Sequence, residues 1–434
     1  MDVWNDPARL AEVPDEVLGP GGVFGFSAML TERSVGPRAV ASGRTRVARI
    51  PGALATPVFT SRQGARFLAQ SLAARSRGAA SPSTSADVAL HAQLNRAETV
   101  DDLARLARGI PSVLAELLAG GFTSGRVIAL YAAIIDTTVR RAIRIVFAAH
   151  PELDRDAFTW LSLGSNGRQE AVLSSDVDSA VAFTDDVPAD LLPAYRAAFG
   201  EVHDVLARGG LSRDWNGATA SREPFARTNT EWRAAALRWM ASPELNQGAI
   251  MASLLVDGRP IEGDPGLPAA LQVFTELRRH PGTMRLLLEE SLAHRARLRT
   301  TRDALRRRPA DIDVKEHALL PVVNLARWAA LSAGSQALGT RDRLVAAAGS
   351  TMLPDDRAAT LVDVFDTLQR LRLRYQLMQH QAGQPPSDTF SEELMSPLDR
   401  SVVAQAVREI ASVQKRMTRL SVYLPTAEWS RPAP

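Results

Sequence analysis

The stretch that decides the fold runs from Leu163 to Phe183 and reads LGSNGRQEAVLSSDVDSAVAF. It begins where the apolar segment FTWLSL ends, and Gly164, Ser165 and Gly167 form a predicted turn. We expect a helix to start near Arg168. Backbone amides and a hydroxyl at a corner between a strand and a helix converge on one place, and such a corner suits a phosphate. The first half of the stretch therefore predicts a strand followed by a phosphate-binding turn.

The second half of the stretch carries a pair of carboxylates, Asp176 and Asp178, directly before the apolar run AVAF. Residues i and i+2 of an extended strand project from the same face, so we expect the two side chains to lie side by side. Two like charges at that separation repel unless a cation lies between them. Either motif alone is common in ordinary loops. Together they predict a triphosphate site beside a magnesium site, which nucleotidyl transfer requires.

Length and composition limit the remaining possibilities. A chain of 434 residues predicts two or three domains, and 45% hydrophobic with 23% charged residues is typical of a folded globular protein. There are no cysteines, which excludes disulfides, thiolate nucleophiles and cysteine-ligated metals. Any metal must therefore be held by oxygen or by imidazole, and the seven histidines show no metal-ligand spacing.

The charge distribution argues against a nucleic-acid partner. The formal net charge is only +3, because acidic residues are nearly as numerous as the arginines, which are scattered over helical segments. The run RARLRTTRDALRRR, from Arg295 to Arg308, is interpreted as a solvated helix face. The N-terminal residues lack a signal-peptide pattern, and the apolar run from Val127 is interrupted by Asp136. We expect a cytoplasmic protein without membrane contacts.

Apolar spacing divides the chain into five parts. Residues 1–77 combine short strands with one amphipathic helix, and residues 78–87 are a linker of small and turn-forming residues. Residues 88–264 contain a helical lead-in and then a core of alternating strands and helices, with GAIMASLLVDGRPI as a strand candidate. Residues 265–424 are helical, and residues 425–434 form a frayed tail. The predicted fold class is α+β, mostly helical, with a small mixed sheet between helical segments and a short β-rich N-terminal part.

The string GSNGRQE, followed by SSDVD, resembles the signature of the DNA polymerase β superfamily in its PII-uridylyltransferase-like branch. From about residue 88 to 424 the chain resembles the signal-transduction nucleotidyltransferases of the DUF294 family. Their C-terminal helical substrate-binding domain is matched by VKEHALLPVVNLARWAAL, GTRDRL, LQRLRLRYQLMQHQAG and PLDRSVVAQAVREIASVQKRM. The resemblance implies a polymerase β-like nucleotidyltransferase core followed by that helical domain.

By this resemblance, four residues of the turn bind the nucleotide. Gly164 and Ser165 would hold its phosphates, and Arg168 would support either the triphosphate or the turn itself. Glu170 matches the family motif, although a glutamate in a first helical turn is more often a dipole or salt-bridge residue.

The resemblance also implies a third carboxylate beside Asp176 and Asp178, and the candidate is Asp257 in SLLVDGRPIEGD. The three aspartates would be the catalytic residues and would bind Mg²⁺, with two ions expected. An aspartate that ends a strand before glycine is also a standard turn residue, so both interpretations of Asp257 stay open. The same alternatives apply to Arg259 and Asp264, which belong to the same motif.

Two functions follow as hypotheses. The first is an enzyme that transfers a nucleoside monophosphate, UMP being one candidate, from a nucleoside triphosphate to a hydroxyl of an unidentified protein or small molecule, in signalling or regulation. The second is a catalytically inactive regulator that senses nucleotide or binds a protein. Ala171 and Ser179 replace the Gln and Asn common in relatives, but neither change removes a metal ligand. The position of Asp257 relative to Asp176 and Asp178 separates the two hypotheses, because an incomplete carboxylate set binds Mg-nucleotide without activating an acceptor.

The segment from Leu18 to Ile50 resembles the second half of a cyclic-nucleotide-binding β-barrel. It keeps Phe24, Gly25 and Arg38 of the phosphate-binding cassette, but Phe26 stands where the family has the glutamate that binds the ribose. A barrel without its first strands cannot close its sheet edges. We interpret the segment as a degenerate remnant or a mis-started gene product that does not bind cyclic nucleotide.

Overall fold

The computed structural model describes residues 2–4, 16–17, 38–41, 45–48, 50, 82–211, 217–244, 248–264, 273–298, 311–391 and 395–431. The chain divides into two compact units. The first comprises Met1–Ala86 with Ala119–Gly121, and the second comprises Asp87–Leu118 with Phe122–Pro434.

Three short strands are described in the first unit. They are β1 (Asp2–Trp4), β2 (Glu16–Val17) and β3 (Arg38–Val40), and they form an antiparallel sheet in the order β2-β1-β3. Arg38 of the predicted phosphate-binding cassette lies in β3. The other cassette positions, residues 24–26, and the amphipathic helix predicted from residue 61 lie outside the described residues.

Helix α4 (Pro82–Arg96) begins within the predicted linker at residues 78–87, and the boundary between the two units, at Ala86 and Asp87, also falls there. Proline fits the first turn of a helix, where its missing N–H leaves no hydrogen bond unmade, so PSTSAD is a helix start. Three further helices complete the lead-in: α5 (Val100–Arg108), α6 (Ile110–Ala119) and α7 (Ser124–Ala148). Thr99 and Thr123 cap α5 and α7 by accepting backbone N–H bonds, as hydroxyl residues at this position do.

The predicted small mixed sheet is confirmed. Its strands are β4 (Phe158–Ser162), β5 (Ser179–Phe183), β6 (Ala226–Thr228) and β7 (Arg259–Glu262), in the order β6-β5-β4-β7. Strand β4 is antiparallel to β5 and β7, whereas β5 and β6 are parallel. A short 3-10 helix, η1 (Arg155–Ala157), precedes β4, and α9 (Leu192–Arg208) connects β5 toward η2 (Glu223–Phe225) and β6.

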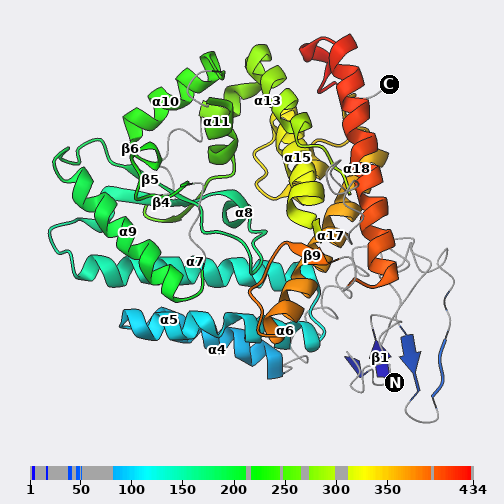
Figure 1. Ribbon diagram of the computed structural model, residues 1–434, viewed down its shortest axis with the longest axis horizontal. Coiled ribbons are helices and arrows are strands. Elements are labelled where there is room, and N and C mark those ends of the chain that lie inside the picture. The colour runs from blue at the N-terminus through cyan, green and yellow to red at the C-terminus, as the bar shows by residue number, and fades with distance from the viewer. Residues whose placement is uncertain are drawn as a thin grey trace. The chain divides into compact units, whose positions relative to one another are not determined.

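Helices lie on both sides of the sheet (Figure 1). The side chains of its two faces belong to two different hydrophobic cores. Trp160 and Val181 point into the core formed with α5, α7 and α9, whereas Leu161 and Ala180 point into the core formed with α10 (Asn229–Ala241), α11 (Gly248–Val256) and the C-terminal helices. This alternation follows from the two-residue period of a strand. The GS turn and the carboxylate pair are therefore attached to a rigid central layer.

The strand predicted over GAIMASLLVDGRPI is only partly correct. Its apolar first half forms helix α11, and only Arg259–Glu262 form a strand. Met251, Ala252 and Leu255 are buried on one side of this helix, with the spacing that a helix requires. The sequence did not show this spacing because nearly every residue of the run is apolar.

The C-terminal region is helical, as predicted, and contains one two-stranded sheet. The elements are η3 (Phe274–Arg279), α13 (Pro281–Ala293), β8 (Asp311–Asp313), η4 (Lys315–Leu319), α15 (Leu320–Ala333), α16 (Thr340–Ala346), α17 (Asp355–Gln381), β9 (Thr389–Ser391), α18 (Pro397–Tyr423) and η5 (Thr426–Glu428). In the part of the chain that the structure describes, no helix is long and apolar enough to cross a membrane.

The frayed tail predicted for residues 425–434 is wrong for its described part, residues 425–431. Trp429 is 1% exposed, and its ring lies 5.5 Å from that of Trp328 in α15. The Thr351 amide donates a 2.8 Å hydrogen bond to the Arg431 carbonyl. Burial of an indole stabilises a terminal segment that its prolines alone would leave loose.

Candidate active site

The GS turn is a single helical turn, α8 (Gly164–Gly167), placed directly after β4. Gly164 has a φ of +54°, and a Cβ added there would overlap the Asp178 carboxylate. A Cβ added at Gly167 would overlap the backbone carbonyl of Asp257 and would lie 2.7 Å from that of Ser162. Glycine is required at both positions, because the Asp178 carboxylate and the backbone carbonyls of Asp257 and Ser162 approach the turn closely.

The helix predicted to begin near Arg168 does not form. Instead Gln169 adopts the left-handed region with a φ of 60°, and the Glu170 amide donates a 2.8 Å hydrogen bond back to the Ser165 carbonyl. The chain therefore reverses immediately after α8 and continues as an irregular loop to the carboxylate pair.

Asp176 and Asp178 are half-buried and lie directly before β5. Val177 between them is 2% exposed and belongs to the core on the α7 side, so the two aspartates project from the opposite face. The turn holds both backbones. The Leu163 amide donates to the Asp178 carbonyl at 3.0 Å, and Asn166 Nδ2 donates to the Asp176 carbonyl at 2.6 Å.

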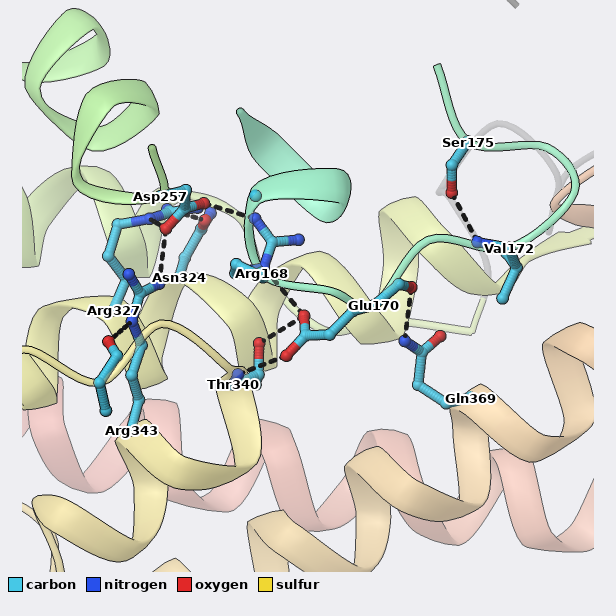
Figure 2. A network of polar contacts seen from close by, with 12 residues as sticks. Arg168, Glu170, Val172, Ser175, Asp257, Asn324, Arg327, Thr340, Arg343 and Gln369 are labelled. Atoms are coloured by element: carbon cyan, nitrogen blue, oxygen red, sulfur yellow. Dashed lines mark hydrogen bonds and ion pairs between the residues drawn. The ribbon is translucent and has the colours of Figure 1, made fainter. Parts of the chain in front are cut away.

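Asp257 lies just after α11, and its side chain is 1% exposed (Figure 2). Three arginines surround its carboxylate. Arg327 donates from Nε at 3.0 Å and from Nη2 at 2.6 Å, Arg343 donates from Nη1 at 2.5 Å, and Arg168 donates from Nη1. Burial alone would raise the pKa of Asp257, but Arg327, Arg168 and Arg343 overcome it and hold that pKa well below its usual range.

Of the two interpretations of Asp257, metal ligand beside Asp176 and Asp178 or structural residue, these contacts favour the second. Both of its oxygens already accept charged hydrogen bonds, which use the lone pairs that a metal would need. Within the described ranges, no group of three or more His, Cys, Asp or Glu side chains is placed to hold a metal ion. Asp257 is an anchor for arginines, and the pair at residues 176 and 178 is the remaining candidate for the metal.

Arg168 and Glu170 connect the turn to the C-terminal helices. Arg168 Nε donates to Glu170 Oε2 at 2.9 Å, and Glu170 also accepts from the backbone amide and hydroxyl of Thr340 at the start of α16. The two side chains are only 9% and 11% exposed. Burial lowers the pKa of Arg168, but Asp257 and Glu170 raise it above its usual range, so the guanidinium stays charged. Of the roles predicted for these residues, support of the turn and salt bridging match this geometry.

Arg259, the second member of the Asp257 motif, holds the other end of the turn. It donates to the carbonyls of Gly167 at 3.2 Å and Asn166 at 3.1 Å. Its guanidinium also forms a two-pronged ion pair with Asp136 of α7, at 2.8 and 2.9 Å. Asp264 contributes a backbone carbonyl that accepts a 2.7 Å bond from Thr159. The motif around Asp257 therefore fixes the backbone of the turn.

Ser179, where relatives have an asparagine, is buried and structural. Its hydroxyl lies 2.9 Å from His203 Nε2 and accepts a 3.0 Å hydrogen bond from the Ala220 amide. His203 is 2% exposed and therefore belongs to the packed interior. Ala171, the other departure, is fully buried in the core on the α7 side.

Arg327, Arg343 and Thr340 were not predicted from the sequence as partners of the turn. The available signal was an arginine within an apolar helix, because NLARWAAL places Arg327 among apolar residues. GTRDRL, which contains Arg343, is polar and carries no such signal. A buried arginine needs a carboxylate partner, and such residues are candidates for a network.

Comparisons with known proteins agree with this architecture. Residues 108–246 match the family model described as "Putative nucleotidyltransferase DUF294". Residues 281–420 match the model described as "Putative nucleotidyltransferase substrate binding domain". Comparison with curated proteins gave no match. The two family models cover the GS turn with strands β4, β5 and β6, and then the helical region, in the expected order, and the chain therefore belongs to the DUF294 nucleotidyltransferase family.

Proposed function

We propose that this protein transfers a nucleoside monophosphate from a nucleoside triphosphate to an acceptor hydroxyl. In this reaction the hydroxyl oxygen bonds to the α-phosphorus, the bond from that phosphorus to the β-phosphate oxygen breaks, and pyrophosphate leaves while the hydroxyl proton passes to solvent. The observation that carries the proposal is the close approach of the Asp178 carboxylate to Gly164 in the turn after β4. This contact supports the proposal, because it brings a carboxylate that could bind a metal close to a turn suited to phosphate.

Asp176 and Asp178 fit a divalent cation in their chemistry. They offer carboxylate oxygens, the ligands that Mg²⁺ prefers, from one face of an extended segment that Val177 anchors in the core. A bound Mg²⁺ would neutralise phosphate charge and stabilise the departing pyrophosphate. Whether one ion or the two expected from the family binds here depends on ligands from the nucleotide itself, because Asp257 is engaged by arginines.

The remaining residues of the site bind and orient. We assign the phosphates to the backbone amides of α8 and the hydroxyl of Ser165, which is half-buried at the first turn. Arg259 and Arg168 hold the turn from its other side through the contacts described above, so the phosphate-binding groups stay fixed as charge moves between α- and β-phosphate oxygens. The C-terminal helices, which match a substrate-binding model, are the proposed acceptor site.

One assay identifies both the nucleotide that is transferred and the acceptor that receives it. The purified protein is incubated with Mg²⁺, a cell lysate and each of the four ribonucleoside triphosphates, labelled in parallel on the α- or the γ-phosphate. The proposal predicts transfer of the α-label and of the base to an acceptor, with release of pyrophosphate. Uridylyl transfer is the outcome that the resemblance to PII uridylyltransferases favours. Transfer of the γ-label would instead indicate a kinase and would contradict the proposal.

A second function is supported by one observation. Three arginines engage the Asp257 carboxylate, so Asp257 is not available as the third metal ligand of the expected set. A site with two carboxylates can bind Mg-nucleotide without activating an acceptor. The alternative is therefore a nucleotide-sensing regulator. It predicts micromolar binding of Mg-nucleotide by calorimetry together with no transfer of label to any lysate component.

A further inference from the structure

The loop between the GS turn and the carboxylate pair is attached to helix α17 through Ser174. The Ser174 hydroxyl donates a 2.8 Å hydrogen bond to Asp388 Oδ1, and it accepts from Gln376 Nε2 at 2.7 Å and from Arg372 Nη2 at 3.2 Å. The Ser174 amide donates to Gln376 Oε1 at 3.2 Å. Ser174 is two residues from Asp176 and four from Asp178, so these contacts fix the backbone that carries the candidate metal ligands.

The groups on α17 form one stripe along the helix. Gln369, Arg372 and Gln376 are spaced by three and four residues, so they lie on the same face. Their exposed fractions are 6%, 4% and 0%, although the helix around them is packed by leucines. Gln369 Nε2 donates to the Glu170 carbonyl at 3.2 Å, at the other end of the same loop (Figure 2). We name residues 369, 372 and 376 the α17 polar stripe.

Asp388 completes the attachment. Its carboxylate accepts from Arg372 Nε at 2.5 Å and Nη2 at 2.9 Å, and from Gln376 Nε2 at 2.8 Å. The Arg372 and Asp388 side chains are only 5% and 11% exposed. A buried ion pair rarely adds stability over apolar packing of the same volume, so stability alone does not account for it. The ion pair between Arg372 and Asp388 does fix the direction of each hydrogen bond, and it therefore fixes the position of Ser174.

We propose that Arg372, Gln376 and Asp388 are positioning residues that set the spacing and orientation of Asp176 and Asp178 through Ser174. The C-terminal helical domain then has a second role beside acceptor binding, because it holds the metal-binding loop of the nucleotidyltransferase core in its working geometry. The inference rests on the proposed function, since it concerns the metal ligands of that site. Groups that orient metal ligands typically change metal affinity about 10- to 100-fold when they are lost.

The test uses the full chain and Mn²⁺ as the metal probe, with free Mn²⁺ measured by electron paramagnetic resonance. Arg372→Lys keeps the charge but loses the two-pronged geometry, and we expect it to weaken Mn²⁺ binding about tenfold or more. Arg370→Lys is the matched control, because Arg370 is exposed on the same helix and should bind Mn²⁺ as the wild type does. Ser174→Ala should also weaken binding, whereas Ser174→Thr, which keeps the hydroxyl, should restore it.

Three further measurements separate positioning from a merely structural role. Circular dichroism and melting temperature should stay close to wild type for Ser174→Ala, which keeps the proposal testable if Arg372→Lys does not fold. Hydrogen exchange of residues 170–178 should become faster in Arg372→Lys and not in Arg370→Lys. In the transfer assay, kcat at saturating nucleotide should fall on the order of 100-fold for Ser174→Ala, while KM for the nucleotide changes by about threefold or less.

Wild-type affinity for Mn²⁺ in both Arg372→Lys and Ser174→Ala would overturn the inference. Equal weakening by Arg370→Lys would also overturn it, because the effect would then not depend on the polar stripe. Failure of the proposed function would look different: the wild type would bind Mn²⁺ and respond to these substitutions, but it would transfer no label.

Discussion

Replacing Asp257 with asparagine distinguishes between two roles of this residue, a structural partner of three arginines and a metal ligand. The substitution keeps the volume of the side chain but removes its charge and one acceptor oxygen. Four hydrogen bonds from Arg168, Arg327 and Arg343 then face a neutral amide whose NH₂ group points at other donors. The Arg343 and Arg168 side chains are 2% and 9% exposed, so water cannot replace the lost partner.

The expected loss is large. Removing one partner of a buried ion pair costs about 3–5 kcal/mol, because the remaining charge stays buried without compensation. The free energy of unfolding of Asp257→Asn should therefore be lower than that of the wild type by about this amount in the absence of any metal. A metal-ligand role predicts the opposite sign, because removal of one of several like charges relieves repulsion in the metal-free protein.

Denaturant unfolding in EDTA measures this difference, with tryptophan fluorescence as the signal. Trp328 and Trp429 pack against each other in the C-terminal region and report on its unfolding. Asp178→Asn is the matched control, because it removes the same charge from a half-buried site and should change stability by about 1 kcal/mol or less. An unchanged or higher stability of metal-free Asp257→Asn would refute the anchor, and a stabilising effect of Mg²⁺ that this variant loses would point to metal binding.

Three further outcomes are expected. Gly164→Ala should abolish both Mn²⁺ binding and label transfer, because the new Cβ overlaps the Asp178 carboxylate at a positive φ; wild-type Mn²⁺ affinity would contradict this. Thr340→Val should lower the free energy of unfolding by about 1–2 kcal/mol, since Thr340 is fully buried and its hydroxyl donates to Glu170 at 2.9 Å; an equal unfolding midpoint would contradict this. The depressed pKa of Asp257 means that its ion pairs stabilise the fold fully above its unfolded pKa, about 3.9, and progressively less as the pH falls toward the lower folded pKa. The stability difference between wild type and Asp257→Asn should therefore be constant from pH 5 to 7 and shrink below about pH 4, and a difference that grows in acid would be inconsistent with the linkage.

Local patterns were sufficient to predict the centre of the fold. The order of strand, GS turn, carboxylate pair and strand is encoded within Phe158 to Phe183, because each step depends on residues a few positions apart. The spacing of Asp176 and Asp178 predicted that they share one face of an extended segment. Val177 between them is buried, which is consistent with that spacing. The helix predicted to start near Arg168 does not form, and Arg168 and Glu170 instead contact Asp257 and Thr340, which are distant in sequence.

Partners distant in sequence were not predictable from the sequence. Arg327 and Arg343 lie 70 and 86 residues from Asp257, and no spacing rule connects them. The apolar run of α11 was ambiguous between strand and helix, because it is too uniformly apolar for either period to show. The segment around Trp429 was predicted to be frayed because it is rich in proline. The packing of the Trp429 indole against Trp328 is a tertiary contact, which local sequence does not show.

The central claim is that Asp176 and Asp178, beside the Gly164 turn, carry out nucleotidyl transfer. The rate of α-label transfer at saturating Mg²⁺ and nucleotide, measured for wild type and Asp178→Ala, tests it most directly. Loss of one metal ligand should cost several kcal/mol of transition-state stabilisation, so the account predicts a rate at least about a thousandfold lower in a variant that melts no lower than wild type in EDTA. Transfer by Asp178→Ala at the wild-type rate would contradict the account.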